Sequence, residues 1–376
     1  MLEAFERFIG GMGFQALTAG NVVMMLIAGL LIYLAIKKGF EPLLLLPIGL
    51  GALLTNIPLN GLLSEPTSEA IGGLYYYISQ GIHLEIFPPM IFLGIGAMTD
   101  FGPLLANPKT FLLGAGAQFG VFTALFLAIL LGFSPNEAAS IGIIGGADGP
   151  TAIFLTLKLA PHLLGPIAVA AYSYMALIPM IQPPIMRLMT TDKERQVVMT
   201  TSKPVSKNVR ILFPIIVTVF SLLVVPASAA LIGMLMAGNL LKESGVVERL
   251  SNMAQNELMN IVTFFLGTSV GMTMNAESFL SLATIKIIIL GIIAFSFSTF
   301  GGLVLGKVLY KVTGGKVNPL IGAAGVSAVP MAARVAHAEG QKYNHNNYLL
   351  MHAMGPNVAG VIGSAVAAGI LLSFFQ

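Results

Sequence analysis

Long apolar stretches alternate with short polar or Gly/Pro-rich breaks from residue 21 to the end of the chain. The pattern delimits eleven hydrophobic segments, at 21–36, 42–57, 87–98, 110–133, 138–157, 163–181, 211–238, 258–274, 285–310, 317–333 and 348–375. A helix that spans a membrane needs about 20 apolar residues, and several segments are shorter or are interrupted by Gly and Pro. The pattern therefore predicts an all-α polytopic membrane protein with ten or eleven hydrophobic segments, of which 138–157 and 317–333 are the least regular.

The two least regular segments resemble each other. Residues 141–152 (IGIIGGADGPTA) and 321–332 (IGAAGVSAVPMA) match at five of twelve positions. Gly and Pro interrupt both stretches, so each is expected to be a discontinuous or re-entrant segment. Two repeats, 42–181 and 211–375, would be inverted relative to each other if each made an odd number of crossings. Inverted repeats with paired broken helices are typical of transporters.

The polar connections predict which ends lie on which side. Residues 182–210 form the longest basic loop and are expected on the cytoplasmic side, whereas the 60–80 loop is expected outside. Four segments lie between these loops, so opposite sides require one of them, most simply 138–157, to be re-entrant. Residues 1–20 carry apolar side chains at helical spacing and are expected to form an interfacial helix. The whole chain, 1–376, is expected to be a single membrane domain.

The composition agrees with a lipid environment. Hydrophobic residues make up 56% of the chain and charged residues 9%, where a soluble domain has about 25% charged residues. These values and a mean hydropathy of +0.87 exclude a water-soluble enzyme. The lack of cysteine excludes disulfides and thiolate metal sites, and a net charge of only +3 gives no reason to expect a nucleic-acid partner. No phosphate-binding or nucleophile motif is present, so energy must come from an ion gradient or a partner's chemistry.

The strongest local signal is the run from Gly145 to Thr151, GGADGPT. Asp148 is one of three aspartates and lies inside an apolar segment, where a carboxylate is costly and usually functional. The flanking glycines and Pro150 would unwind a helix there and free backbone carbonyls. Carboxylate and carbonyl oxygens are the ligands that hard cations such as Na⁺ prefer. The alternative is that Asp148 only caps a half-helix or reaches the interface.

The matching stretch of the second repeat offers neutral oxygens and one cation. Asn318 and Ser327 lie in it, and Arg334 follows it and could hold a carboxylate by two hydrogen bonds. Arg334 could equally anchor a helix end at the interface. Asn357 follows a Gly-Pro pair in the last segment, and Tyr174 lies inside another apolar segment. A phenol there could relay a proton, although most such tyrosines are core residues.

These motifs together resemble one protein family. The stretches IGIIGGADGPTAIF at 141–154, NPLIGAAGVSAVPMAARVAH at 318–337 and HAMGPNVAGVIGSAVAAG at 352–369 look like the beta subunit of the sodium-pumping biotin-dependent decarboxylases. Members of this family include the oxaloacetate, methylmalonyl-CoA and glutaconyl-CoA decarboxylases. The resemblance runs from about residue 40 to the C-terminus, and the GGADGPT motif is its most specific part.

The resemblance implies a membrane subunit that decarboxylates carboxybiotin, consumes a proton and moves Na⁺ outward. The residues that it implicates are Asp148, Asn318, Ser327 and Asn357 for Na⁺, and Arg334, Tyr174 and Ser327 for catalysis. In this hypothesis Arg334 orients carboxybiotin in a dry pocket, and Tyr174 or Ser327 relays the proton. Biotin would arrive as carboxybiotin on a carrier subunit, so the cofactor would be held by a partner.

The resemblance also implies a complex in a bacterial cytoplasmic (inner) membrane, crossed by several spans. The implied partners are a carboxyltransferase alpha subunit, the biotin carrier subunit, a small membrane subunit, membrane lipid and further copies of this chain. The organic acid is selected by the carboxyltransferase, and the length of 376 residues favours the shorter beta subunits of the acyl-CoA decarboxylases. The alternative function is a stand-alone secondary transporter, either a Na⁺/H⁺ antiporter or a Na⁺-coupled anion carrier. Both functions need an intramembrane carboxylate, and only the GGADGPT motif favours the decarboxylase.

Overall fold

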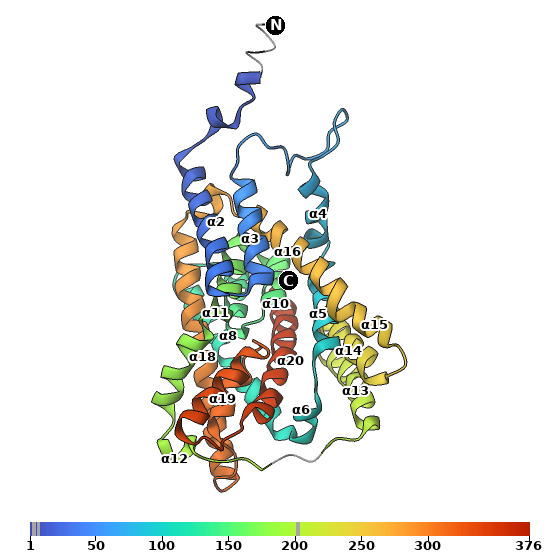
Figure 1. Ribbon diagram of the computed structural model, residues 1–376, viewed down its shortest axis with the longest axis vertical. Helices are drawn as coiled ribbons and strands as arrows, with labels where there is room; N and C mark the ends of the chain where they lie inside the picture. The colour runs from blue at the N-terminus through green and yellow to red at the C-terminus, as the bar shows by residue number, and fades with distance from the viewer. Residues whose placement is uncertain (2–4, 6–7, 201–203) are drawn as a thin grey trace.

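The computed structural model describes residues 1, 5, 8–200 and 204–376, except for the side chains of 174–176. Every regular element in these ranges is helical (Figure 1). The first half contains α2 (Ala19–Lys38), α3 (Pro42–Thr55), α4 (Leu74–His83), α5 (Phe87–Met98), α6 (Gly102–Ala106), α7 (Phe111–Ala117), α8 (Phe119–Leu130), α9 (Pro135–Gly142), α10 (Gly149–Leu159), α11 (Leu164–Met189) and α12 (Asp192–Arg195). The second half contains α13 (Lys207–Val224), α14 (Ala229–Ser244), α15 (Glu248–Met253), α16 (Met259–Met272), α17 (Ala276–Phe279), α18 (Leu282–Val312), α19 (Met331–Tyr343) and α20 (Leu350–Phe375). Two 3-10 turns also form part of the site, η3 (Ile143–Gly146) and η7 (Pro319–Gly325).

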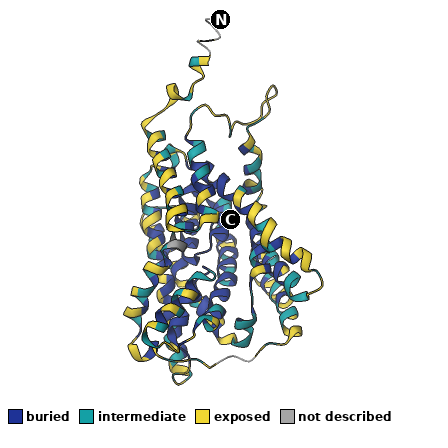
Figure 2. Cartoon of the chain, viewed as in Figure 1, coloured by how far each residue is buried: buried dark blue, intermediate teal, exposed yellow. Residues whose placement is uncertain are grey.

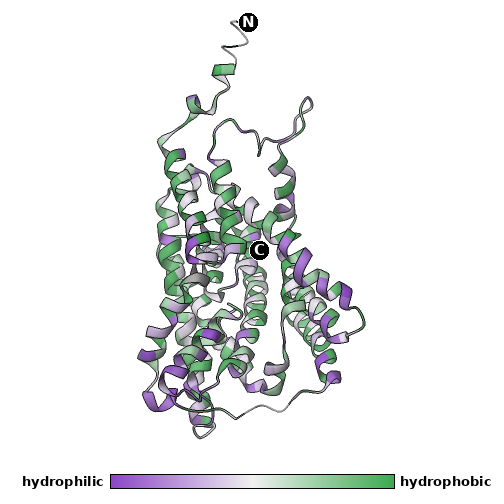
Figure 3. Ribbon diagram, viewed as in Figure 1, coloured by the Kyte–Doolittle hydropathy of each residue, from purple (hydrophilic) through white to green (hydrophobic). Residues whose placement is uncertain are grey.

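The helices form a bundle with several membrane-spanning elements. Within the described ranges, the helical stretches that are long and apolar enough to cross a membrane are Ala19–Lys38, Pro108–Leu130, Lys207–Val224, Leu282–Val312 and Leu350–Phe375. Two bent pairs raise this number to seven, namely α4 with α5, bent by 65°, and the two parts of α11, bent by 63°. Exposed apolar side chains cover the outer helices, and hydrophilic residues gather around α12 and α15 (Figure 2, Figure 3). The predicted all-α polytopic membrane protein is confirmed.

Two predicted boundaries are wrong. The segment predicted at 211–238 is two helices, because Val225 ends α13 and Pro226 opens a 3-10 turn before α14. Proline lacks the N–H that would continue the helix and disfavours helical backbone at the residue before it. The connection predicted at 60–80 ends earlier, because α4 begins at Leu74.

The basic stretch predicted as a loop at 182–210 is packed against the bundle over much of its length. α11 continues through its first residues to Met189, and α12 follows within a few residues. The guanidinium of Arg195 is buried, donates to Thr190 Oγ1 at 2.9 Å and lies 4.5 Å from the centre of the Tyr343 ring. These contacts hold the stretch in place.

The two ends of the bundle can be distinguished. The N-terminus and the connection between α3 and α4 lie at one end, called here the N-terminal end, and α12 lies at the other, the basic end (Figure 1). Near the start of α18, Lys286 donates to the carbonyl of Leu131, and near its end Lys307 donates to that of Met189. Lys307 lies 21 positions after Lys286, which corresponds to roughly 31 Å of helix, about the thickness of a hydrocarbon core. The connections predicted on opposite sides therefore lie at opposite ends.

The predicted interfacial helix at 1–20 lies partly outside the described residues. Its described part contains a 3-10 turn, η1 (Gly13–Ala16), and exposed aromatic side chains at Phe8 and Phe14. α2 already begins at Ala19. The interfacial helix stays a prediction.

Each half of the chain contains one re-entrant hairpin. In the first hairpin, residues 135–163 (α9, η3 and α10), His162 Nε2 lies 2.9 Å from Glu137 Oε1. In the second, residues 318–347 (η7 and α19), Asn318 and Asn347 each donate from Nδ2 to one backbone carbonyl, that of the last residue of α12, at 2.9 Å. In each hairpin, these contacts therefore hold the first and last residues close together. The first hairpin follows α8 at the N-terminal end and the second is clipped to α12 at the basic end, so they enter the bundle from opposite ends.

One buried carboxylate ties α19 of the second hairpin to α11. The side chain of Glu339 is only 1% exposed, with Arg187 Nε 2.5 Å from Oε1 and Lys342 Nζ 2.8 Å from Oε2. Burial alone would raise the pKa of Glu339, but the hydrogen bonds from Arg187 and Lys342 lower this pKa below its ordinary value of 4.5. The ionised carboxylate therefore stabilises the fold above pH 4.5, and this contribution is lost as the pH falls through the lowered pKa.

We expect Glu339→Gln to lower the free energy of unfolding by about 1–2 kcal/mol at pH 7, because two cations lose a charged acceptor. The difference from wild type should shrink as the pH falls below 4.5, since protonation of Glu339 removes the same charge. Thermal unfolding of the detergent-solubilised protein between pH 7 and pH 4 measures both effects. Glu248→Gln, at an exposed carboxylate of α15, is the control. A Glu339→Gln protein as stable as wild type at pH 7 would contradict this role.

Candidate functional site

The tips of the two hairpins meet inside the bundle. The N–H of Ser327, in the second hairpin, donates to the carbonyl of Gly146, in the first, at 3.0 Å. Ser364 of α20 joins both tips, because its hydroxyl shares a hydrogen bond with that of Ser327 and donates to the Gly146 carbonyl at 3.4 Å. The two segments predicted as broken therefore build one site.

Asp148 lies at the tip of the first hairpin. η3 ends at Gly146, and the left-handed backbone of the next residue, Ala147 (φ 55°, ψ 42°), reverses the chain. Asp148 is the N-cap of α10. Its Oδ2 accepts a hydrogen bond from Thr151 Oγ1 at 2.7 Å, and the carboxylate is almost wholly buried. Asp148 therefore does cap a half-helix, as the alternative interpretation proposed, and it also lines a cavity.

A cavity of about 390 Å³ lies beside the contact between the tips. Its walls are mainly apolar, and its polar lining residues are Thr99, Asp100, Asp148, Tyr172, Thr263 and Ser327. The hydroxyl of Tyr172 is buried and has no hydrogen-bond partner among the described residues. A carboxylate and several hydroxyls between apolar walls make this a place where a small cation could be held by oxygen atoms.

The two predicted asparagine ligands lie in different places. Asn357 of α20 is fully buried, donates to the carbonyl of Val326 at 2.6 Å, and has an Oδ1 without a partner in the described part of the chain. This position is directly beside Ser327 of the second tip. Asn318 instead lies at the base of the second hairpin, where its Nδ2 donates to two carbonyls of the 195–197 stretch and its Oδ1 accepts from the N–H of Leu320. Asn318 does not line the cavity, and both polar atoms of its side chain have partners at the base of the hairpin.

Arg334 lies on the first turn of α19, just beyond the cavity. Its backbone N–H donates to the carbonyl of Pro330, which lines the cavity together with Val329. The Arg334 side chain is exposed and makes no hydrogen bond or ion pair to the described residues. Arg334 is not among the residues that line the cavity, but its guanidinium, four residues after Pro330, has no partner in the described part of the chain and is available to bind an anion.

Comparison with known proteins identifies the family. Residues 20–375 match the family described as the Na⁺-transporting oxaloacetate decarboxylase beta subunit. The chain belongs to this family. The beta subunit of methylmalonyl-CoA decarboxylase from Propionigenium modestum is 57% identical to it over the whole of both chains. The beta subunit of glutaconyl-CoA decarboxylase from Acidaminococcus fermentans is 59% identical over 98% of this chain and 97% of its own length, and the oxaloacetate decarboxylase beta chain of Klebsiella pneumoniae is 48% identical over 99% of each.

Membership of the Na⁺-transporting decarboxylase beta subunits confirms the resemblance predicted from the GGADGPT motif. It also confirms the predicted function as the membrane subunit of a sodium-translocating decarboxylase. A stand-alone secondary transporter is not favoured, because the relatives that match over nearly their whole length are decarboxylase subunits. The assignment of individual residues rests on the geometry of the cavity.

Among the tyrosines of this beta subunit, the structure points to one that the sequence analysis did not select. Tyr174 lies in α11, but its side chain falls outside the described residues, so its predicted role stays a prediction. Tyr172, two residues earlier, lines the cavity, and its ring packs against the backbone of Gly149 next to Asp148. In the sequence, Tyr172 and Tyr174 are equivalent phenols in one apolar run, so the pattern gave no reason to select Tyr172.

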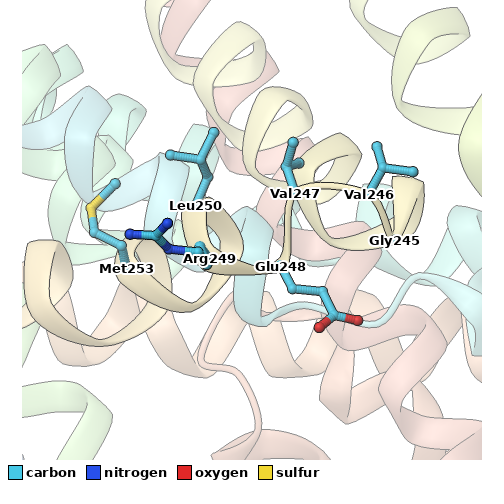
Figure 4. Close-up of a pocket in the computed structure, with 7 residues that line it drawn as sticks. All are labelled: Gly245, Val246, Val247, Glu248, Arg249, Leu250 and Met253. Carbon is cyan, nitrogen blue, oxygen red and sulfur yellow. The ribbon is translucent and has the colours of Figure 1, made fainter.

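A second hollow, of about 880 Å³, lies at the turn between α14 and α15 and is open to the outside (Figure 4). It is lined by one continuous stretch, in which Arg249 extends toward Met253 and Glu248 points the other way. No described residue of another part of the chain lines it, so it presents no converging groups. The cavity between the hairpin tips is therefore the candidate functional site.

Proposed function

We propose that Na⁺ binds between the hairpin tips, with the Asp148 carboxylate as its charged ligand. Ser327 and Tyr172 supply neutral oxygens from the opposite walls of the same cavity. The unpartnered hydroxyl of Tyr172 supports this set, because a buried donor or acceptor without a partner costs free energy unless a ligand uses it. Asn357, with its free Oδ1 beside the second tip, is retained in the ion path, whereas Asn318 is replaced by Tyr172 as a ligand.

Arg334 is proposed to bind the carboxylate of carboxybiotin. Its planar guanidinium can donate two parallel hydrogen bonds to a carboxylate, and no described residue accepts a hydrogen bond from it or forms an ion pair with it. The apolar walls beside Val329 and Pro330 would strip water from the bound group, and the loss of hydration favours release of CO₂. Ser327 and Tyr174 are the proposed relay for the proton that replaces the lost carboxylate. Biotin itself would remain attached to a partner subunit.

The two hairpins are proposed to switch between two arrangements and thereby to couple the decay of carboxybiotin to the movement of Na⁺. They enter from opposite ends and touch at one backbone hydrogen bond, from Ser327 to Gly146. A small shift of either tip would therefore change both the Na⁺ ligands and the access to the cavity. In both of two helix pairs, a helix of the first half packs on a helix of the second half, α3 on α16 and α5 on α14. Each pair has a close contact at a glycine, Gly271 in the first pair and Gly238 in the second. This similarity of the two pairs supports the division into two inverted repeats.

The proposed surroundings follow from the charge distribution and the relatives. Positive residues near the basic end support a cytoplasmic position for this end, and we propose that the membrane is the bacterial inner membrane and that Na⁺ moves from the basic end to the N-terminal end. The carboxyltransferase and the biotin carrier would approach the basic end, and a small membrane subunit and further copies of the chain would complete the complex. Identities of 57–60% to acyl-CoA decarboxylase subunits, against 47–49% to oxaloacetate decarboxylase chains, favour an acyl-CoA as the substrate of the complex.

The binding of carboxybiotin is tested by replacing Arg334 in the full chain reconstituted in liposomes. We expect Arg334→Gln to raise the half-saturating concentration of free carboxybiotin by about 10- to 100-fold, the loss of one charged hydrogen-bonded pair, while the Na⁺ requirement stays unchanged. The half-saturating concentration of Arg334→Lys should lie between those of wild type and Arg334→Gln, because an ammonium keeps the charge but cannot donate two parallel hydrogen bonds. Arg249→Gln removes another exposed arginine, away from the cavity, and is the matched control. Equal carboxybiotin requirements in wild type and Arg334→Gln would overturn the assignment.

A further inference from the structure

The cavity between the hairpin tips reaches the surface at Asp100. This residue lines the cavity together with Asp148, yet its side chain is 47% exposed. It follows Met98, the last residue of α5, and lies beside the start of α13, which continues from the basic stretch. The mouth of the cavity at Asp100 therefore opens toward the basic end.

One arginine connects Asp100 to a second carboxylate at this mouth. Arg210 of α13 donates from one Nη atom to Asp100 Oδ1 at 3.2 Å and to Glu243 Oε1 at 3.0 Å. Its Nε lies 2.9 Å from Glu243 Oε2, close enough for an ion pair but without hydrogen-bond geometry. Glu243 is nearly buried, whereas Asp100 is half exposed. Arg210 is thus anchored on Glu243 and makes its longest and most accessible contact with Asp100.

The rest of the mouth is fixed, and one oxygen of Asp100 is left free. Lys242 Nζ donates to the carbonyls of Met98 and Thr99 at 3.1 Å each, which holds the end of α5. Asp100 Oδ1 also accepts from the N–H of Gly102 at 2.8 Å, whereas its Oδ2 has no partner among the described residues. A carboxylate oxygen without a partner therefore stands at the opening of a cavity that contains Asp148.

We infer that Asp100 is the first carboxylate that Na⁺ meets on its way from the basic end to Asp148, and that Arg210 competes with Na⁺ for it. The inference rests on the proposed binding of Na⁺ at Asp148. The two carboxylates Asp100 and Glu243 balance the two cations Arg210 and Lys242, so the mouth has no net charge, and the free Oδ2 of Asp100 is the negative group that attracts a cation there. Arg210 limits this attraction and thereby sets the Na⁺ concentration at which the cavity fills.

This role predicts opposite effects for the two partners of one ion pair. Asp100→Asn gives the mouth a net charge of +1 and is expected to raise the half-saturating Na⁺ concentration by about 3- to 10-fold. Arg210→Gln gives it a net charge of −1 and is expected to lower the half-saturating concentration by a similar factor. The double variant has the net charge of wild type and should return to within about twofold of it. A merely structural ion pair would instead move both single variants in the same direction.

The measurement is the rise in the melting temperature of the purified full-length chain as NaCl is added. The same titration is repeated in the presence of a fixed concentration of added choline chloride. Bound Na⁺ stabilises the folded state by mass action, so the titration gives the half-saturating concentration without any turnover. Choline should reduce the differences between variants, since it screens charge without binding as Na⁺ does. Asp192→Asn removes the carboxylate of another arginine pair at the basic end, that with Arg195, and is the control with no expected shift.

Several outcomes decide the inference. Shifts of Asp100→Asn and Arg210→Gln in the same direction, or shifts in neither, would overturn it while the proposed Na⁺ site at Asp148 stands. If Arg210→Gln does not fold, Glu243→Gln also removes one negative charge from the mouth and must raise the half-saturating concentration as Asp100→Asn does. A wild-type chain that Na⁺ does not stabilise at all would overturn the proposed function, and this inference with it.

Discussion

Replacing Asp148 by Asn is expected to lower Na⁺-dependent decay of carboxybiotin by at least about 100-fold. Asp148 is the deeply buried carboxylate of the cavity in the described part of the chain, and Asn keeps its size while removing its charge. A desolvated cation loses most of its binding free energy without a charged ligand, and about 2.7 kcal/mol corresponds to the stated factor. The decay of free carboxybiotin in proteoliposomes, titrated with Na⁺, measures the effect.

The Asp148→Asn experiment needs a control for folding and for surface charge. Asp192→Asn changes another of the three aspartates, at an exposed position away from the cavity, and should behave as wild type. The amide oxygen introduced by Asp148→Asn can still accept the hydrogen bond from the N–H of Thr151, so the helix cap is retained and the melting temperature should change little. If Asp148→Asn retained the Na⁺ stimulation of wild type, the ion would bind elsewhere.

Replacing Gly360 by Ala is expected to abolish both Na⁺ binding and catalysis. A Cβ at this position of α20 would lie 2.2 Å from the carbonyl oxygen of Gly325, so α20 and the second hairpin could not keep their present contact. Ser364 lies one turn further along α20 and holds Ser327 and Gly146 together, so the tips would separate. The expected loss in the free energy of unfolding is about 3 kcal/mol, the upper part of the range for overpacking.

The matched control is a glycine of a helix with free space around it. A Cβ at Gly29 of α2 meets nothing within 4 Å, and Gly29→Ala should therefore be neutral or stabilise by up to about 1 kcal/mol. Thermal unfolding and Na⁺ titration of both variants distinguish the effect of the close contact at Gly360 from the effect that a glycine-to-alanine change has in any helix. A Gly360→Ala protein with wild-type stability and Na⁺ binding would show that the tips do not depend on this contact.

The sequence alone located the centre of the site because its signals there are local. A carboxylate inside an apolar run is costly, and the glycines and proline around Asp148 forbid a continuous helix. These facts are visible without a fold, and they predicted both the break at the first tip and its counterpart around Ser327. The family motif then supplied the function, which the comparisons confirmed.

Properties that depend on packing could not be predicted in this way. Asn318 lies in a Gly/Pro-rich stretch as a ligand would. Its amide nitrogen, however, donates to the carbonyls of Arg195 and Val197, which lie far away in the sequence. The position of Tyr172 in the cavity wall depends on how α11 is rotated against the first hairpin, which the sequence does not show. The division of 211–238 into α13 and α14, by contrast, was signalled by Pro226 and could have been predicted.

The central claim is that one cavity couples carboxybiotin decay to Na⁺ movement. The most direct measurement follows both in the same proteoliposomes, which contain only this chain, with free carboxybiotin outside and ²²Na⁺ as tracer. The account predicts that ²²Na⁺ moves across the membrane only while carboxybiotin decays, and that withdrawal of either reactant stops both processes. Decay at an undiminished rate without Na⁺, or ²²Na⁺ movement driven by a proton gradient with no decay, would contradict it.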